Sequence, residues 1–208
     1  MTKMIAPDKQ IVILASASPR RTVLLEQLGL VPDKIIPADI DEAPHKGELP
    51  APYAKRMAFE KTAAIAERYP EAFVIGADTV VACGRRILPK AESEAQARSC
   101  LSLLMGRSHR VYGGIALAIP KSGSVLAHIK VKTNHSKVSF RRLDEVEMQD
   151  YINQGDWDGK AGGYAIQGAA ARYITSISGS YSQIMGLDIY EMYHLLKGAG
   201  FRPETACP

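Results

Sequence analysis

Residues 11–29 read IVILASASPRRTVLLEQLG, and this stretch decides the class of fold. Its first five residues are apolar and rich in β-branched side chains, which is typical of a strand buried on both faces. Ser18 and Pro19 then suit the cap and the first position of a helix, and Gly29 suits its end. A buried strand that leads directly into a helix predicts an α/β fold.

Strand and helix patterns continue to alternate along the rest of the chain. Apolar or alternating runs predict strands at 34–36, 72–82, 109–119, 125–141 and 172–178. Caps and apolar stripes predict helices at 52–68, 93–106, 144–154 and 181–197. No repeat or long linker interrupts this pattern, so residues 1–208 are expected to form a single domain, and two lobes around a shared sheet remain open.

Composition places the chain among ordinary globular proteins. It has 208 residues, 46% apolar and 23% charged, and 26 Lys and Arg against 22 Asp and Glu give a net charge of +4. These values exclude wholesale disorder, a collagen-like repeat and a disulfide scaffold. The small charge excess does not indicate a nucleic-acid partner, and basic and aromatic residues do not interleave as on a nucleic-acid surface.

The cysteines and the apolar runs favour a cytoplasmic protein. Cys83, Cys100 and Cys207 lie far apart and form no CxxC pair, which indicates reduced thiols. The apolar stretch 11–15 is too short for a signal peptide, and no apolar run approaches the ~20 residues that a membrane helix needs. We therefore expect no membrane partner.

The junction SASPRR at 16–21 is the first candidate site. A strand delivers two hydroxyls and two guanidiniums to a helix N-terminus, where free N–H groups and the helix dipole favour an anion. In the alternative interpretation, Ser18 only caps the helix and Arg20 and Arg21 are solvated. Two cations at a helix N-terminus oppose the dipole unless an anion compensates them, so we favour phosphate binding. The chain has no GxxxxGK[ST] loop.

Asp78 is the second candidate, because it interrupts the apolar run VIGADTVV at 74–81. An ionised carboxylate in a buried strand is costly unless it is paired or binds a metal. Asp78 could bind a divalent ion or activate water, or it could simply accept backbone hydrogen bonds at a strand end. The acidic loop residues Asp39, Asp41 and Glu42 are expected to be solvated, but one of them could complete a Mg²⁺ or Mn²⁺ site with Asp78.

The glycine-rich segment DGKAGGYAIQG at 158–168 is the third candidate. Its glycines allow the backbone to approach a ligand closely, and the Gln167 amide suits the edge of a nucleobase. The alternative is a flexible surface loop, although Tyr, Ala and Ile are rather apolar for one. Lys61 and Lys90 are unremarkable by themselves, and either could be a solvated surface lysine.

Several other classes of site are excluded by motif. The five histidines show no HExxH spacing and the cysteines offer no zinc site. The chain also lacks the GxSxG elbow of serine hydrolases and the GxGxxG turn of dinucleotide-binding sheets.

Taken together, three segments resemble the Maf family of nucleoside triphosphate pyrophosphatases, over roughly residues 11–201. They are LASASPRRTVLLEQLG (14–29), VIGADTVV (74–81) and GKAGGYAIQGAAARYITSISGSYSQIMGLDIYE (159–191). The resemblance implies a two-lobed α/β fold, with a mixed sheet flanked by helices and a central nucleotide-binding cleft, as in inosine triphosphate pyrophosphatases. It also implies a homodimer, and metal-assisted hydrolysis of a nucleoside triphosphate to the monophosphate and pyrophosphate.

The resemblance also assigns roles to residues. Asp78 matches the family's proposed catalytic base, and Glu42 matches the glutamate of its acidic loop. Contacts with the triphosphate are implied for Ser16, Arg20, Arg21, Lys61 and Lys90. Base selectivity is implied for three residues shared with members that prefer dTTP and UTP over a methylated guanine nucleotide: Arg20, Thr79 and Gln167.

One departure from the family is Ala91, which stands where members often have proline.

The resulting hypothesis is an enzyme whose metal, Mg²⁺ or Mn²⁺ with Co²⁺ as a third option, is held by Asp78 and Glu42. Asp78 could instead accept the proton of the attacking water directly. Two alternatives stay open: a non-enzymatic nucleotide-binding regulator of septum formation and cell division, and a pyrophosphatase for non-canonical purine nucleotides.

Overall fold

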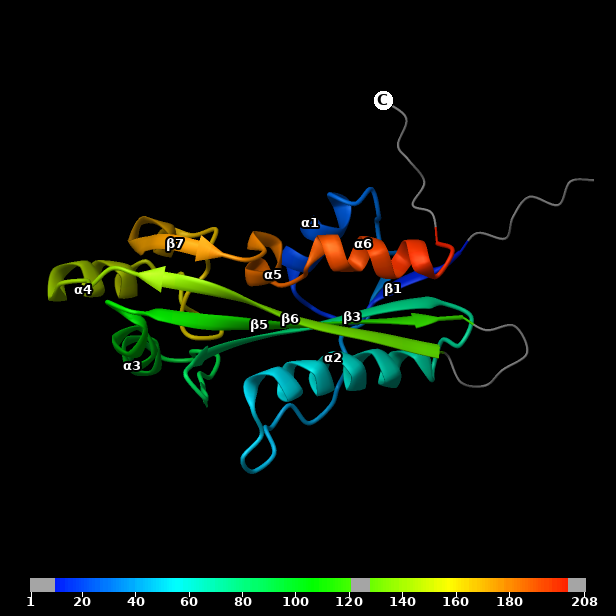
Figure 1. Ribbon diagram of the computed structural model, residues 1–208, viewed down its shortest axis with the longest axis horizontal. Coiled ribbons are helices and arrows are strands. Elements are labelled where there is room, and N and C mark those ends of the chain that lie inside the picture. The colour runs from blue at the N-terminus through cyan, green and yellow to red at the C-terminus, as the bar shows by residue number, and fades with distance from the viewer. Residues whose placement is uncertain (1–9, 121–127, 202–208) are drawn as a thin grey trace, which may run out of the picture.

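A computed structural model describes residues 10–120 and 128–201 of the chain (Figure 1). The strands are β1 (Val12–Leu14), β2 (Lys34–Ile35), β3 (Phe73–Cys83), β4 (Arg86–Ile87), β5 (Ser108–Ile119), β6 (His128–Phe140) and β7 (Ile174–Ser178). The helices are α1 (Pro19–Glu26), α2 (Pro50–Ala66), α3 (Glu94–Leu104), α4 (Glu145–Asn153), α5 (Tyr181–Met185) and α6 (Ile189–Gly198), with a 3₁₀ helix at Ala169–Tyr173. Cys207 lies outside the described residues.

The strands form one mixed sheet in the order β2-β1-β3-β5-β6-β7, and β4 pairs with β3. β1 is parallel to β2 and to β3, whereas the other pairs are antiparallel. The long strands β3, β5 and β6 form a twisted ribbon, with α2 on one face and α5 and α6 on the other (Figure 1). The predicted α/β class, with a mixed sheet flanked by helices, is confirmed.

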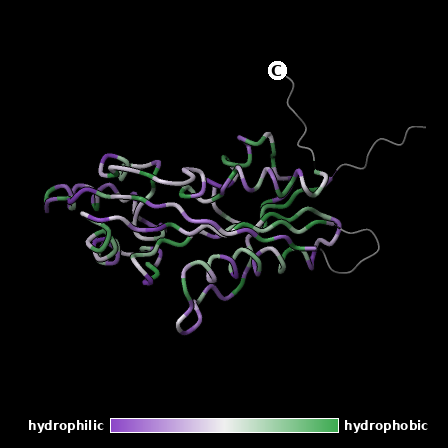
Figure 2. Tube along the Cα trace, viewed as in Figure 1, coloured by the Kyte–Doolittle hydropathy of each residue, from purple (hydrophilic) through white to green (hydrophobic). Residues whose placement is uncertain are grey.

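β1 is buried on both faces, as its apolar run predicts. Val12 and Leu14 pack in a core with residues of α1, β3 and α6, while Ile13 packs on the other side with Ile65 and Val74. Figure 2 shows hydrophobic residues gathered where β1 and β3 run side by side. No described helix is long and apolar enough to cross a membrane.

Two glycines bring α2 unusually close to the sheet. A Cβ atom on Gly76 of β3 would lie 2.0 Å from Thr62 Oγ1, and one on Gly114 of β5 would lie 2.0 Å from the Ala54 carbonyl oxygen. Only glycine allows this approach. It brings the side chain of Lys61 from α2 to Asp78 on β3.

One expectation about the helices is wrong, and another is confirmed only in position. The helix expected over 181–197 is two helices, because Gly186 has a φ of 144° and Asp188 starts α6 by accepting hydrogen bonds from the Tyr190 and Glu191 amides. Ser18 stands at the N-cap position of α1, but its side chain accepts no capping hydrogen bond. The first three residues of the strand expected over 125–141 lie outside the described residues.

Candidate active site

A cleft of about 420 Å³ opens beside the end of β1 and the middle of β3. It is lined by all nine residues predicted from the sequence as site residues: Ser16, Arg20, Arg21, Glu42, Lys61, Asp78, Thr79, Lys90 and Gln167. They come from distant parts of the chain, which the sheet order and the tight packing of α2 bring together. Asp39 and Asp41 do not line the cleft; both are exposed, and Asp41 Oδ1 accepts the Ala43 amide in a turn.

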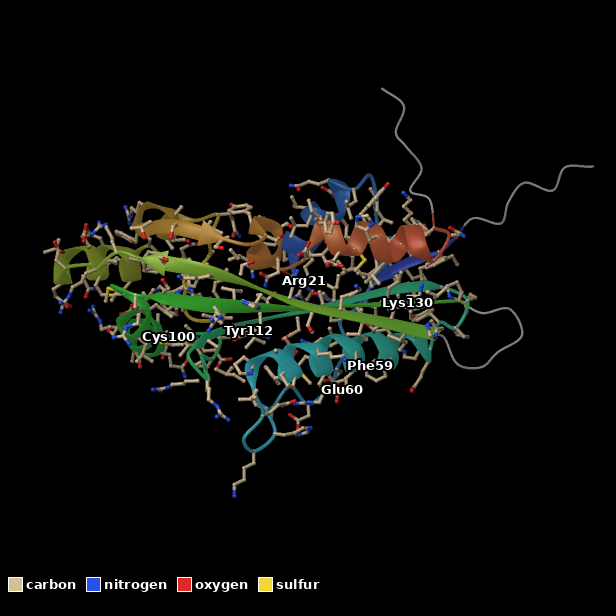
Figure 3. The ribbon with its side chains drawn as sticks, viewed as in Figure 1. Arg21, Phe59, Glu60, Cys100, Tyr112 and Lys130 are labelled. Atoms are coloured by element: carbon tan, nitrogen blue, oxygen red, sulfur yellow. The ribbon has the colours of Figure 1, made fainter. Side chains whose placement is uncertain are left out.

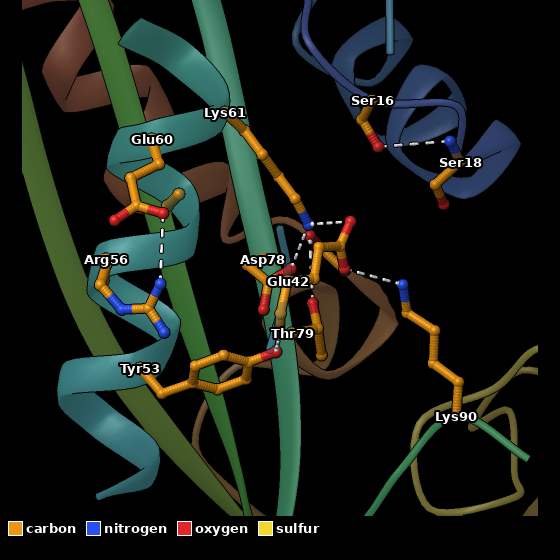
Figure 4. Close-up of polar contacts among 12 residues, drawn as sticks. Ser16, Ser18, Glu42, Tyr53, Arg56, Glu60, Lys61, Asp78, Thr79 and Lys90 are labelled. Atoms are coloured by element: carbon orange, nitrogen blue, oxygen red, sulfur yellow. Dashed lines mark hydrogen bonds and ion pairs between the residues drawn. The ribbon is translucent and has the colours of Figure 1, made fainter. Parts of the chain in front are cut away.

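A chain of ion pairs crosses one end of the cleft (Figure 4). Lys61 Nζ lies 2.7 Å from Asp78 Oδ1 and 3.0 Å from Glu42 Oε1. Lys90 Nζ lies 3.1 Å from Glu42 Oε2. Asp78 and Lys61 are buried, so each charge depends on its partner; an unpaired charge there would be strongly destabilising.

Glu42 is held as an anion between the two lysines. Partial burial opposes its ionisation, but the Lys61 and Lys90 ammonium groups outweigh burial and lower the pKa of Glu42. The Tyr53 hydroxyl donates to the Glu42 carbonyl at 2.6 Å and so fixes the backbone of the acidic loop. Burial, reinforced by Asp78 and Glu42, raises the pKa of Tyr53 to about 12, so this donor keeps its proton at neutral pH.

Sequence reasoning missed the residues that hold the acidic loop against α2. Arg56 Nε and Nη2 donate to both carboxylate oxygens of Glu48, at 2.8 and 2.7 Å, and Nη2 also reaches the Ala43 carbonyl at 3.0 Å. The Arg56 guanidinium lowers the pKa of Glu48 to about 2. Tyr53 and Arg56 stand three residues apart on α2, and this helical spacing was the available signal.

Two guanidiniums face the cleft on the opposite side. Arg21 Nη1 donates to Ser16 Oγ at 2.6 Å, and its Nε donates to the Gly186 carbonyl at 2.9 Å. Arg20 Nε donates to the Met185 carbonyl at 3.2 Å. Within the described ranges neither arginine forms an ion pair with a carboxylate, so carbonyl and hydroxyl oxygens orient two positive charges without neutralising them.

The environment of Arg21 indicates an anion site. Burial lowers the pKa of Arg21, and the field of Asp78 opposes this effect. Figure 3 shows Arg21 where α1 and α5 face the long strands. A half-buried, unneutralised guanidinium of this kind is a suitable ligand for phosphate oxygens.

The carboxylates fit a hard divalent cation only in part. Asp78 and Glu42 supply oxygen ligands, the chemistry that Mg²⁺ and Mn²⁺ prefer. Among residues 10–120 and 128–201, no group of three or more His, Cys, Asp or Glu side chains could hold a metal. A cation at this place therefore needs further oxygens from water or phosphate, and it needs Lys61 to leave its bridging position.

Asp158 and Lys160 also line the cleft, but part of its remaining wall is apolar and ends at an exposed amide. Val81, Val111 and Ile166 line it, and the exposed Gln167 stands at its rim. Thr79 Oγ1 lies 3.5 Å from Arg21 Nη2. An apolar slot with one amide at the rim suits the flat face and polar edge of a nucleobase.

The glycine-rich segment is packed, which overturns the alternative of a flexible surface loop. The Ala91 amide donates to the Lys160 carbonyl at 3.0 Å, and the Gly159 amide donates to the Ala91 carbonyl at 2.8 Å. These bonds fix Lys90 against the segment. A proline at position 91 has no N–H and could not make the first of them.

Comparisons with known proteins show which proteins this chain is similar to. Residues 11–199 match the family described as Maf-like protein. A dTTP/UTP pyrophosphatase of Paramagnetospirillum magneticum is 56% identical over 193 residues, which cover 93% of this chain and 99% of that protein. A dTTP/UTP pyrophosphatase of Caulobacter vibrioides is 50% identical over 191 residues, 92% of this chain and 96% of that protein. A solved HAM1 protein from Coxiella burnetii aligns with a TM-score of 0.43 and 12% identity, covering 91% of this chain and 99% of that one.

Proposed function

Because this chain belongs to the Maf family, we propose that it hydrolyses dTTP and UTP to the nucleoside monophosphate and pyrophosphate. The observation that carries the proposal is the charge arrangement of the cleft. Two guanidiniums, which form no ion pair with a carboxylate of the described residues, face an acid–lysine cluster across a space of about 420 Å³. A triphosphate needs several positive charges at its oxygens before water can attack phosphorus, and the cleft provides them.

The arginines bind the phosphates in this proposal. Their Nε atoms donate to the Met185 and Gly186 carbonyls. Arg20 then offers its Nη groups to the ligand, and Arg21, whose Nη1 and Nη2 also contact Ser16 and Thr79, offers the remaining Nη hydrogens. Ser16 Oγ accepts hydrogen bonds from Arg21 Nη1 and, at 3.2 Å, from the Ser18 amide, so its own proton is free to be donated to a phosphate oxygen. Lys61 and Lys90 add charge from the opposite side of the cleft.

Asp78 activates the water. Its carboxylate is buried and oriented by Lys61, so it can accept a proton at a fixed place or hold a divalent ion together with Glu42. Mg²⁺, Mn²⁺ or Co²⁺ bound there would neutralise phosphate charge and lower the pKa of bound water. In either role the Asp78–Lys61 pair must loosen when substrate enters, and the phosphate oxygens give the Lys61 ammonium a new partner.

Gln167 reads the pyrimidine. Its amide offers one acceptor and two donors, which match the neighbouring N–H and C=O groups on the edge of uracil or thymine. Arg20 and Thr79 complete the set in which this chain resembles dTTP- and UTP-selective members.

We further propose a cytoplasmic homodimer in which each chain is one domain with two lobes around the cleft, without nucleic-acid or membrane partners.

A nucleotide panel tests the proposal. UTP, dTTP, CTP, GTP and ITP are each incubated with Mg²⁺ or Mn²⁺, and released pyrophosphate is measured. We expect release from UTP and dTTP at rates at least about tenfold above those for the purine nucleotides. Preferred hydrolysis of ITP would instead support clearance of non-canonical purines, and binding without pyrophosphate release would support a nucleotide-sensing regulator.

A further inference from the structure

A buried histidine stands directly behind the apolar wall of the cleft. His109 and Val111 are two residues apart on β5, so their side chains point to the same face of the sheet. Val111 lines the cleft, whereas His109 is only 2% exposed and belongs to none of the roles proposed above.

His109 makes one specific polar contact. Its Nε2 lies 2.7 Å from the hydroxyl oxygen of Tyr164, which is also buried. Among the described residues its Nδ1 has no hydrogen-bond partner. Burial lowers the pKa of His109 to about 4, so the ring is neutral at pH 7 and the contact is a hydrogen bond between neutral groups.

Burying the His109–Tyr164 pair costs more free energy than burying two apolar side chains. Leucine or phenylalanine at both places would bury similar volume without leaving a ring nitrogen unpaired. The pair does, however, fix the orientation of Tyr164: its ring meets the His109 and Phe140 rings edge-on, with centroids 5.4 and 5.1 Å away. A polar pair in an otherwise apolar cluster therefore defines one position for this ring.

Tyr164 begins the part of the glycine-rich segment that leads directly along the cleft to Gln167. Gly162 and Gly163 precede it with left-handed φ values of 69° and 71°, and Tyr164, Ala165 and Ile166 all line the cleft before Gln167. The Gly168 amide closes this stretch by donating to the Ala165 carbonyl at 3.1 Å. A displacement of Tyr164 can therefore be transmitted along this short stretch to the backbone that carries Gln167.

We propose that His109 is a positioning residue, which holds Tyr164 and through it sets the place of the Gln167 amide at the nucleobase. This inference rests on the proposed function, since it concerns selection of the base by the same cleft. It predicts that the His109–Tyr164 pair governs discrimination between bases rather than handling of the phosphates.

The test compares Tyr164→Phe, which removes a single oxygen atom, with Tyr173→Phe. Tyr173 is a second buried tyrosine of the same core, and its hydroxyl donates to the Glu147 carbonyl at 3.3 Å, away from the cleft. The measurement is kcat/KM for UTP divided by kcat/KM for GTP, with the melting temperature recorded for each variant.

We expect Tyr164→Phe to lower this ratio about fivefold, the factor that matches one neutral hydrogen bond, mainly through a higher KM for UTP. Tyr173→Phe should lower the melting temperature but leave the ratio within twofold of wild type.

His109 is tested by two substitutions. His109→Leu removes the hydrogen bond with the Tyr164 hydroxyl and should lower the UTP/GTP ratio of kcat/KM as much as Tyr164→Phe does. The double variant His109→Leu/Tyr164→Phe should show no further fall in this ratio. His109→Gln keeps a polar group near the former Nε2 and should recover at least half of the lost selectivity. If His109→Leu does not fold, Tyr164→Phe alone carries the test.

Two results would overturn the inference, and they are distinguishable from failure of the proposed function. An unchanged UTP/GTP ratio in Tyr164→Phe, at a lowered melting temperature, would show that the pair only stabilises the core. An equal fall in kcat for both nucleotides would place its effect on the phosphates. If wild type releases no pyrophosphate from UTP or dTTP, the proposed function itself fails, and this inference fails with it.

Discussion

Asp78 places a carboxylate in a buried strand, which costs folding free energy, and the same carboxylate is the proposed catalytic group. Asp78 is 7% exposed in the middle of β3, and its carboxylate lies 2.7 Å from the Lys61 ammonium. Because its neighbours along the strand are apolar, the sequence already marks it as a residue with a particular role.

Asp78→Asn should abolish most turnover while nucleotide binding survives. Asparagine preserves the shape of the side chain but neither accepts a proton nor holds a metal, and loss of such a group costs about 10²–10⁴-fold in rate. Pyrophosphate release and calorimetric binding of UTP to the same preparations check this. Asp39→Asn, an exposed carboxylate outside the cleft, is the matched control. Full activity of Asp78→Asn would contradict the assigned role.

Lys61→Met should strengthen binding of Mn²⁺ in the absence of nucleotide. The Lys61 ammonium bridges Asp78 and Glu42, so a cation between these carboxylates must displace it. Removing that charge should improve the affinity at least about tenfold, measured as free Mn²⁺ by electron paramagnetic resonance. Lys55→Met, an exposed lysine of α2, should bind Mn²⁺ as wild type does. Equal affinities in all three proteins would show that Lys61 does not compete with the metal.

At the scale of elements, the strands were more predictable than the contacts between them. Buried strands have apolar, β-branched runs that appear in any sequence, and β1 and β3 follow them to within a residue or two. The close approach of α2 has no such pattern, because it depends on two glycines from different strands facing one helix. The break between α5 and α6 was missed because Ile184, Leu187 and Met192 keep an apolar stripe across it.

Gly114→Ala should destabilise the protein by about 2–3 kcal/mol. The new methyl group would meet the Ala54 backbone oxygen at 2.0 Å, so α2 must move away from the sheet, and Lys61 with it. Urea unfolding measures this, and pyrophosphate release should fall in parallel. Gly198→Ala, with nothing nearer than Lys130 Nζ at 4.0 Å, should be neutral or slightly stabilising. A Gly114→Ala protein as stable as wild type would contradict the tight packing described for α2.

At the scale of the whole molecule, the residues that line the candidate site were more predictable than the contacts among them. Three segments contain six of the nine predicted residues that line the cleft, and the family resemblance assigned roles to the other three, Glu42, Lys61 and Lys90. The sequence could not show that Lys61 lies between Asp78 and Glu42 or that carbonyls of residues 185 and 186 orient Arg20 and Arg21. Nor could it show that His109 contacts the Tyr164 hydroxyl beside the cleft. These contacts join residues up to 165 positions apart, and no local pattern encodes them.

The stability of the molecule should depend on pH through His109. The pKa of His109 falls from about 6.5 in the unfolded chain to about 4 in the native state. Between these two pH values the unfolded chain therefore binds a proton that the native state does not bind. Stability is therefore complete above pH 6.5 and declines as pH falls toward 4, with a loss of about 2 kcal/mol between pH 7 and pH 5. His109→Gln should lack most of this decline, whereas His128→Gln, at an exposed position, should keep it. Equal declines in both variants, measured by urea unfolding, would contradict the assignment to His109.

The most direct test of the central claim is the identity of the products. Phosphorus NMR of UTP incubated with the protein and Mg²⁺ distinguishes cleavage between the α- and β-phosphates from cleavage at the terminal phosphate. We predict UMP and pyrophosphate in equal amounts, with the release of both slowed at least about 100-fold in Asp78→Asn. UDP with orthophosphate, or UTP that stays intact in a folded wild-type sample, would contradict the account.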